Sequence, residues 1–169
     1  MVVAKFGNKD STKSLDIRSL LFDDPLDAFK VLKTTNAGMS FNALRTLRSY
    51  FGFSQMRIMC VKPPKKFELI TTNDEKGRAV IDYLTSNSSS RPEACGSFTK
   101  HAWSDFGRNC NIWADQKWGK AGLYGNDRLY GVIAYSTLKQ LYVSMGAQGR
   151  FSCNDNQSDS PLSFTLYVR

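Results

Sequence analysis

The spacing of apolar side chains changes near residue 53, and this change constrains the fold more than any other feature. Before it, apolar residues recur at helical spacing, and after it several segments alternate apolar and polar residues as strands do. We therefore predict a single domain, residues 1–169, of α+β class. A mainly helical basic part, residues 1–53, precedes a mainly β part, residues 54–169, that forms a mostly antiparallel β-sandwich or a partly open barrel.

Two segments of the N-terminal part carry local signals for helix starts. Residues 24–32 begin with Asp-Pro, which predicts a helix because Asp caps a helix N-terminus and Pro suits the first helical position. Ser40 is the predicted cap of a second helix, which covers residues 41–51 and ends at Gly52. We expect the buried stripe of this second helix to be Phe41, Leu44, Leu47 and Phe51.

The end of the sequence contains the clearest strand in the chain. From Leu162 to Val168, Leu, Phe, Leu and Val alternate with Ser, Thr and Tyr, so one face of the strand is apolar. We expect this strand to be paired within a sheet. Residues 78–85 fit either a strand or a short helix, after a turn at 73–77. The other predicted strands are residues 55–62, 67–72, 129–135 and 140–145.

Positive charge is concentrated in the first two fifths of the chain. The whole chain has a formal charge of +8, and residues 1–66 hold 12 Lys and Arg against 5 Asp and Glu, a net of +7. Residues 67–169 hold 11 against 10, and no acidic residue lies between residues 28 and 67. The basic residues of this acid-free segment, all predicted to bind nucleic acid or another anion, are Lys30, Lys33, Arg45, Arg48, Arg57, Lys62, Lys65 and Lys66.

This asymmetry of charge points to a polyanionic partner, either nucleic acid or an acidic membrane surface. Cations interleaved with aromatic residues can bind phosphates while the rings stack on bases, and such binding weakens steeply as salt is added. The alternative is a solvated basic face that only keeps the protein in solution. The aromatic residues of the acid-free segment are expected to lie mainly in the core.

The sequence contains no motif for catalysis, for a cofactor or for a metal ion, and we predict that the protein is not an enzyme. The four cysteines lack the paired spacing of a zinc site, and His101 is the one histidine. A Cys–His hydrolase that uses His101 with Cys95 or Cys110 is the weaker alternative. The chain has neither a signal peptide nor an apolar run that could cross a bilayer, so we expect reduced thiols, and two disulfides only if it is secreted.

The segment around Trp113 and Trp118 combines a high density of aromatic side chains with interrupting polar ones. Exposed tryptophans stack on sugar rings or enter a lipid headgroup layer, whereas buried ones pack in a core. Both interpretations stay open here, and Trp113 and Trp118 are kept as candidate aromatic contacts.

Two resemblances to viral proteins follow from the pattern of the chain. The C-terminal string LYGVIAYSTLKQLYVSM, a turn-rich stretch and the final LSFTLYVR resemble the closing strands of small jelly-roll coat proteins. The small size, basic charge and helix-then-sheet plan resemble matrix proteins of negative-strand RNA viruses, such as those of plant rhabdoviruses. The absence of an Arg-rich N-terminal arm favours the matrix resemblance, which implies a protein that bridges nucleocapsid and membrane.

We accordingly predict a non-enzymatic viral structural protein, matrix- or coat-like, located in the virion or the host cytoplasm. It is expected to self-associate and to bind RNA, a nucleocapsid or an acidic membrane through its basic face. One alternative is a free single-stranded RNA-binding protein. Another is a β-sandwich recognition module of the lectin or toxin kind, which would use its tryptophans.

Overall fold

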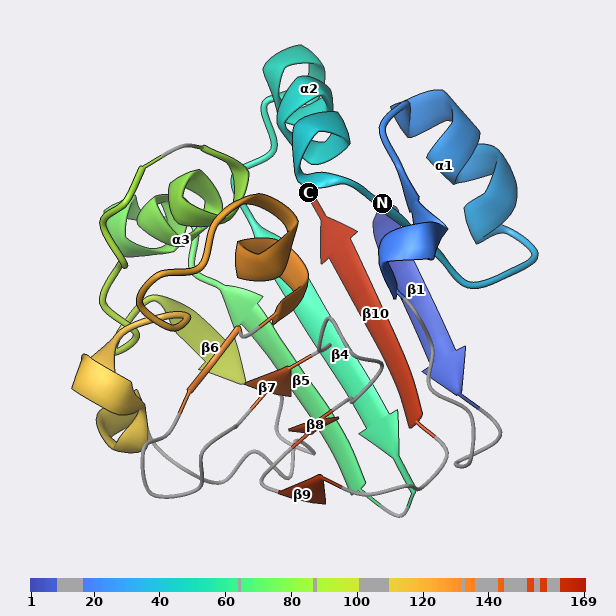
Figure 1. Ribbon diagram of the computed structural model, residues 1–169. Helices are drawn as coiled ribbons and strands as arrows, with labels where there is room; N and C mark the ends of the chain where they lie inside the picture. The colour runs from blue at the N-terminus through green and yellow to red at the C-terminus, as the bar shows by residue number, and fades with distance from the viewer. Residues whose placement is uncertain are drawn as a thin grey trace.

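Strands and helices alternate along the chain in the computed structural model (Figure 1). The strands are β1 (Val2–Asn8), β2 (Leu21–Phe22), β3 (Ala37–Met39), β4 (Met56–Lys62), β5 (Lys65–Thr71), β6 (Phe98–Lys100), β7 (Val143–Ser144), β8 (Ser152–Cys153), β9 (Asn156–Gln157) and β10 (Leu162–Val168). The helices are α1 (Pro25–Leu32), α2 (Phe41–Phe51) and α3 (Glu75–Thr85), with short helical turns η1 (Ile17–Leu20), η2 (Cys110–Ile112), η3 (Ala114–Gln116) and the π-helical η4 (Asp127–Gly131). The residues that the structure describes are 1–8, 17–63, 65–86, 88–100, 110–131, 133–135, 143–144, 152–153, 156–157 and 162–169.

A seven-stranded sheet organises the molecule, with strand order β2-β3-β1-β10-β4-β5-β6. The last strand, β10, lies in the middle of this sheet and pairs antiparallel with β1 on one side and β4 on the other. Among the described strand pairs, β2 and β3 are the pair that runs parallel. A small second sheet has the order β7-β8-β9. The two ends of the sequence therefore lie close together at one end of the neighbouring strands β1 and β10, as the N and C labels of Figure 1 show.

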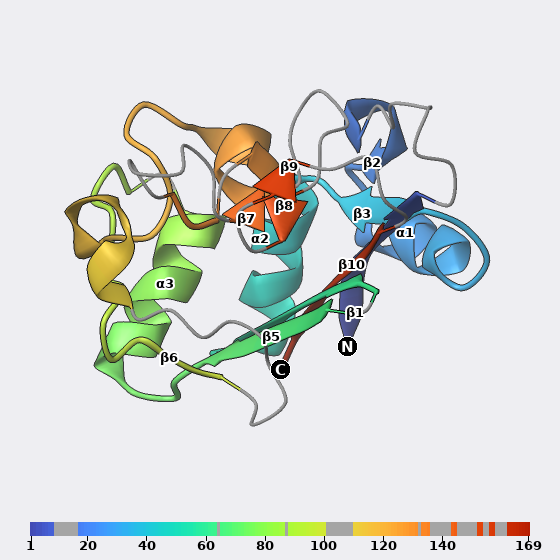
Figure 2. The same ribbon diagram turned by 90° about the horizontal axis from the view of Figure 1, so that it is seen from below.

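The helices cover the sheet unequally. Figure 2 shows α2, α3 and η4 on one side of the sheet, and α1 on the other side beside β1 and β3. Strand β3 is consequently buried on both faces. Gly38 in β3 has no room for a side chain, because an added Cβ would lie 2.7 Å from the ring of Phe6. On the side away from α2, no described helix covers β10, β4 and β5.

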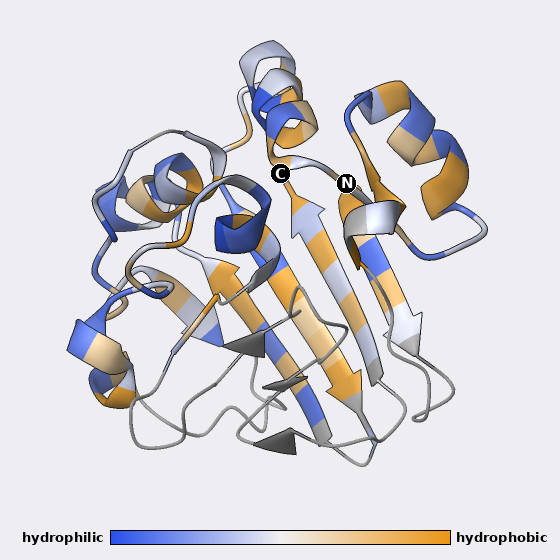
Figure 3. Cartoon of the chain, in the orientation of Figure 1, coloured by the Kyte–Doolittle hydropathy of each residue, from blue (hydrophilic) through white to orange (hydrophobic). Residues whose placement is uncertain are grey.

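The core lies between the sheet and the layer formed by α2, α3 and η4. Figure 3 shows the alternation of hydrophobic and hydrophilic residues along the long strands, which is what a half-covered sheet requires. The fully buried side chains on the covered side of β4, β5 and β10 come from alternate positions. They are Met56, Ile58, Cys60, Phe67, Leu69, Phe164, Leu166 and Val168.

The three helices begin at side chains that cap their free backbone N–H groups. Asp24 accepts a hydrogen bond from the N–H of Leu26, and Ser40 accepts one from Ala43. Asp74 accepts one from Gly77 at 3.0 Å. At the other end of α2, Gly52 adopts the left-handed conformation, with φ of 60°. The predicted helices at residues 24–32 and 41–51 are therefore confirmed, including their ends.

The predicted fold class is wrong. Helices are interleaved with strands instead of preceding them, and an open seven-stranded sheet in a mixed α/β fold takes the place of the predicted sandwich or partly open barrel. The error begins with β1, because Val2–Asn8 is a strand inside the part predicted to be helical. It pairs with β10 across the whole length of the sequence, and no local pattern reveals such a pairing.

Several local predictions also need correction. Within the predicted turn at 73–77, Asp74 is the N-cap of α3 and residues 75–77 are its first turn, and 78–85 are helix. Residues 129–131 belong to the π-helical η4 and not to a strand. Phe51 was expected in the buried stripe of α2, but it is 71% exposed at the end of a helix that extends beyond the sheet (Figure 1). The predicted strands at 55–62, 67–72 and 162–168 are confirmed as β4, β5 and β10, within a residue or two at their ends.

Candidate anion-binding site

The cations of the acid-free segment whose side chains are described do not come together on one surface. Lys30 and Lys33 belong to α1 and its end, whereas Arg45 and Arg48 belong to α2 on the opposite side of the sheet (Figure 2). The β4–β5 hairpin, which carries the remaining lysines, lies at the far end of the strands from both helices (Figure 1). These lysines are Lys62, Lys65 and Lys66; only the backbone of Lys62 and Lys65 is described, and Lys66 is exposed.

Carboxylates neutralise several of these cations. Lys30 pairs with Asp27 at 2.8 Å, and this contact raises the pKa of Lys30. Arg48 lies 2.6 Å from Asp82 and also donates to the hydroxyl of Thr85. Lys33 and Arg45 are exposed on separate helices. A contiguous track for a polyanion is not formed by the cations whose side chains are described.

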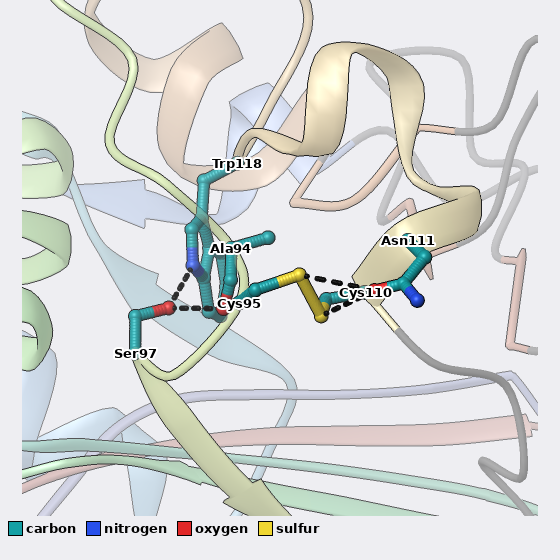
Figure 4. The surroundings of a disulfide bond; sticks show 6 residues. All are labelled: Ala94, Cys95, Ser97, Cys110, Asn111 and Trp118. Carbon is teal, nitrogen blue, oxygen red and sulfur yellow. Dashed lines mark hydrogen bonds between the residues drawn. A yellow bond between two sulfur atoms is a disulfide. The ribbon is translucent and has the colours of Figure 1, made fainter.

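Trp113 and Trp118 are buried and do not form a contact surface. They are 2% and 0% exposed, and their rings meet edge-to-face with centroids 5.1 Å apart. Phe98 stacks on Trp113, and the Nε1–H of Trp118 donates to Ser97 Oγ at 2.7 Å (Figure 4). The core interpretation of these two tryptophans is therefore the right one.

A disulfide joins Cys95 to Cys110 beside this aromatic cluster (Figure 4). The amide oxygen of Asn111 lies 3.3 and 3.4 Å from the two sulfur atoms. Cys60 is also disulfide-bonded, so every cysteine whose side chain is described is oxidised. The expectation of reduced thiols is wrong for these residues, and a Cys–His hydrolase has no thiolate at Cys95 or Cys110. His101 lies outside the described residues.

Arg57 differs from the other cations of the acid-free segment because it belongs to a built site. Alternation along β4 places Arg57 on the side of the sheet that faces away from α2 and α3. The strand register sets Tyr167 of β10 opposite Arg57 on one side and Ile70 of β5 opposite it on the other. Glu68 lies one diagonal step away on the same face, within reach of the Arg57 side chain.

Two contacts hold the guanidinium group of Arg57. Its Nε lies 2.7 Å from Oε1 of Glu68, a carboxylate whose side chain is only 3% exposed. Its central carbon lies 4.9 Å from the centroid of the Tyr167 ring. The Arg57 side chain is nevertheless 41% exposed, and its terminal Nη groups have no hydrogen-bond partner in the described part of the chain.

Arg57, Glu68 and Tyr167 line a pocket of about 330 Å³ at the end of the sheet where the chain termini meet. Gln55, Ile70 and Arg169 are among its other lining residues. The Nε–H of Arg169 donates to Oε1 of Gln55 at 2.8 Å, which fixes both side chains at the rim. The pocket is at the small end of the range for small-molecule sites.

The chemistry of this arrangement is that of an anion receptor. A guanidinium group offers parallel N–H donors that match the two oxygens of a carboxylate, phosphate or sulfate. Here Nε of the group lies against Glu68 and one face lies over the Tyr167 ring, so the Nη groups are the donors left for another acceptor. Sequence reasoning identified Arg57 but missed Glu68 and Tyr167. The register of a β4–β5 hairpin would have indicated Glu68.

Comparison with known proteins adds no relative: no protein-family model, curated protein or solved structure matches the chain. Among the described residues, no helix has the length and apolar character needed to cross a membrane. The same residues contain no group of three or more side chains that could hold a metal ion. A matrix or coat role, self-association, and binding of RNA, nucleocapsid or membrane stay predictions from the sequence.

Proposed function

We propose that the protein is a non-enzymatic binding protein that recognises an anionic group in the Arg57 pocket. The observation that carries this proposal is that Arg57 contacts Glu68 and Tyr167, lines a pocket, and has no acceptor for its Nη groups among the described residues. A guanidinium group that served only the fold would be expected to donate its hydrogen bonds to acceptors of the protein.

Restraint matters because it lowers the cost of binding. A flexible arginine loses rotamer freedom when it grips a ligand, and this loss reduces the affinity. The ion pair to Glu68 and the stacking on Tyr167 have already fixed the side chain of Arg57. Less conformational entropy is then lost when Arg57 forms two hydrogen bonds to an anion, so the affinity is higher.

The scattered positions of the other cations favour a discrete site over a polyanion track. Binding to a polyanion would release several counterions and would weaken with a steep power of the salt concentration. For binding of one anionic group in the Arg57 pocket, the logarithm of the binding constant should fall with the logarithm of the salt concentration with a slope of about one. The salt dependence therefore separates this proposal from RNA binding by the basic segment.

The disulfides support a second part of the proposal, which concerns location. Disulfides persist in oxidising compartments and are rare in the cytosol. We infer that the protein folds in an oxidising compartment and meets its anionic ligand there. Alkylation of protein taken directly from its source, before and after reduction, tests this: free thiols at Cys95 or Cys110 would contradict it.

The test of the binding proposal is a titration of ¹⁵N-labelled protein with acetate and with inorganic phosphate at constant ionic strength. The signals of Arg57 and Tyr167 should move with saturating behaviour. Arg57→Lys keeps the charge that pairs with Glu68 but lacks the planar fork, so it should weaken binding by about tenfold. The matched control is Arg45→Lys, which makes the same exchange at an exposed position on α2 and should leave the affinity unchanged.

Equal affinities for the wild type and for Arg57→Lys would overturn the proposal. So would shifts confined to the β4–β5 hairpin, because the lysines there would then be the binding residues. In that case, reversal of Lys65 and Lys66 to Glu should weaken binding of RNA or of acidic vesicles, as the sequence-based prediction requires.

A further inference from the structure

A second arginine shares the pocket with Arg57. Arg169 directly follows β10, and it exchanges two backbone hydrogen bonds with Gln55, each of 3.0 Å. One step further along the same pair of strands, Tyr167 lies opposite Arg57. Because side chains alternate along a strand, residues 55 and 57 share one face of the sheet with residues 167 and 169. All four residues line the pocket.

This register sets Arg57 and Arg169 at diagonal positions on neighbouring strands. Side chains at such positions start about 7–8 Å apart, which is within the combined reach of two long side chains. Both arginines line the same pocket of about 330 Å³. A small group bound in that volume can therefore contact both guanidinium groups at once.

The two guanidinium groups are held in similar ways. The Nε–H of Arg169 donates to Oε1 of Gln55 at 2.8 Å, and the amide nitrogen of Gln55 donates in turn to the carbonyl oxygen of Thr71 at 2.8 Å. The Nε of Arg57 lies 2.7 Å from Glu68. In the described part of the chain, the Nη groups of neither arginine have a hydrogen-bond partner. Two sets of Nη donors therefore remain for one ligand.

The number of donors bears on the shape of the ligand. A carboxylate has two oxygens in one plane, and a single guanidinium group satisfies both. A sulfate, sulfonate or phosphate group has three terminal oxygens that do not lie in one plane with its central atom. Such a group can keep two oxygens on one arginine and direct the third to another. A pair of arginines around one pocket thus matches a tetrahedral anion better than a planar one.

We propose that Arg57 and Arg169 together bind one tetrahedral oxyanion, the sulfate or phosphate group of an ester, and that Arg169 is the second binding residue of the pocket. This inference rests on the proposed anion-binding function and deepens it by naming the ligand class. Two oxygens of the anion would accept from the Nη groups of Arg57, and the third from those of Arg169. The pocket has room for the anionic end group of a larger ligand.

Acetate and methanesulfonate test the shape of the anion at constant charge, because each is a methyl group that carries one negative charge at pH 7.5. Glu68, the ammonium group of Met1 and the α-carboxylate of Arg169 act on both probes alike, so their effects largely cancel in the ratio of the two dissociation constants. In titrations of ¹⁵N-labelled protein at constant ionic strength, methanesulfonate should bind about fivefold more tightly. It should move the Nε–H signals of both Arg57 and Arg169.

The variant Arg169→Lys isolates the contribution of the second arginine. Lysine keeps the positive charge and lacks the planar fork, so the preference for methanesulfonate should fall to about twofold or less. The affinity for acetate should change by less than about twofold, since acetate needs only Arg57. The matched control is Arg45→Lys on α2, which should leave both affinities and their ratio unchanged.

Methyl sulfate and methyl phosphate separate the two sources of such a group. At about pH 5.5 both are mostly monoanions, so their charges are matched to each other and to that of acetate. The ester that binds more tightly identifies the source, and at least one of them should bind more tightly than acetate. If neither does, the assignment to tetrahedral oxyanions is wrong.

The outcomes separate this inference from the proposal on which it rests. If acetate binds at Arg57 as tightly as methanesulfonate, the ligand class is wrong and the anion-binding function stands. If Arg169→Lys folds and keeps the full preference, Arg169 is not a binding residue and the inference fails. If neither probe moves the signals of Arg57, both the inference and the proposed function are wrong.

Discussion

Arg57 and Arg128 lie on opposite sides of the same sheet, and they use the same functional group in opposite ways. Arg128, in η4, is 3% exposed and donates to the backbone carbonyls of Tyr83, Ser86, Ser88 and Leu123. Its guanidinium carbon lies 4.4 Å from the centroid of the Tyr83 ring. Arg57 contacts the carboxylate of Glu68 and the ring of Tyr167, and its Nη groups have no acceptor among the described residues.

The contrast separates a cation whose donors the fold uses from one whose donors it leaves available. Arg128 is surrounded by acceptors that the fold itself supplies, so it ties the end of α3 to the segment before η4 and leaves little for a ligand. Arg57 is held by contacts at one edge and one face only. A restrained guanidinium group with an open edge is therefore a better sign of a binding site than the number of cations in a segment.

The largest expected effect is the loss of Arg128. Arg128→Met removes a buried cation and leaves the carbonyl groups of Tyr83, Ser86 and Ser88 without their donor. We expect a loss of about 3 kcal/mol or more in the free energy of unfolding, measured by urea denaturation. Binding of acetate at the Arg57 pocket should persist wherever the variant remains folded. A loss below about 1 kcal/mol would remove the contrast between the two arginines.

The disulfide beside the aromatic cluster should come next in size. The Cys95–Cys110 bond closes a loop with a sequence separation of 15 residues. In the chain-entropy treatment, its removal in the double variant Cys95→Ala, Cys110→Ala costs about 3 kcal/mol. Thermal unfolding of the variant measures this cost. Since both cysteines are on the side of Trp113 and Trp118, the Arg57 signals should keep their positions in the spectrum, and large shifts there would contradict the independence of the two regions.

Alkaline pH should destabilise the side of the sheet that contains Arg128, because the buried tyrosines lie there. Burial raises the pKa of Tyr130 far above its ordinary 10.0, and burial also raises that of Tyr83, although Arg128 opposes the shift. A raised pKa in the folded state means that this stability is present below about pH 10 and is lost as the pH rises further. Tyr130→Phe should flatten the pH dependence of unfolding above pH 10, at a cost of about 1 kcal/mol for the hydrogen bond to Met39. An unchanged pH profile in this variant would show that Tyr130 is not the titrating group.

The smallest effect should come from Arg57. Arg57→Lys keeps a cation beside Glu68, so the free energy of unfolding should change by about 1 kcal/mol or less. Arg45→Lys should change it even less. Chemical denaturation of both variants measures these differences. A loss for Arg57→Lys as large as that for Arg128→Met would mean that Arg57 serves the fold.

The sequence predicts the elements whose signals are local. Helices α1 and α2 follow from Asp24 and Ser40, because a cap and a stop residue lie within a few positions of each other. The start of α3 was missed because Gly77 is a poor helix residue. Glycine is required at this position by a contact in the folded structure, because a Cβ at Gly77 would lie 1.8 Å from the carbonyl oxygen of Thr72.

Long-range pairing is what the sequence could not supply. Strand β1 becomes a strand because β10 lies beside it, and η4 is wound as a π-helix where its apolar composition suggested a strand. For the site, charge was enough to select Arg57 as one of eight candidates. Its distinction from the other seven needed Glu68 and Tyr167, which only the sheet register brings to it.

A crystal structure of the protein with acetate bound tests the anion-binding function most directly. Both carboxylate oxygens should lie within hydrogen-bond distance of the Nη groups of Arg57, with Nε still against Glu68. Acetate bound elsewhere with the pocket empty, or Arg57 turned so that its Nη groups meet acceptors of the protein, would contradict this function.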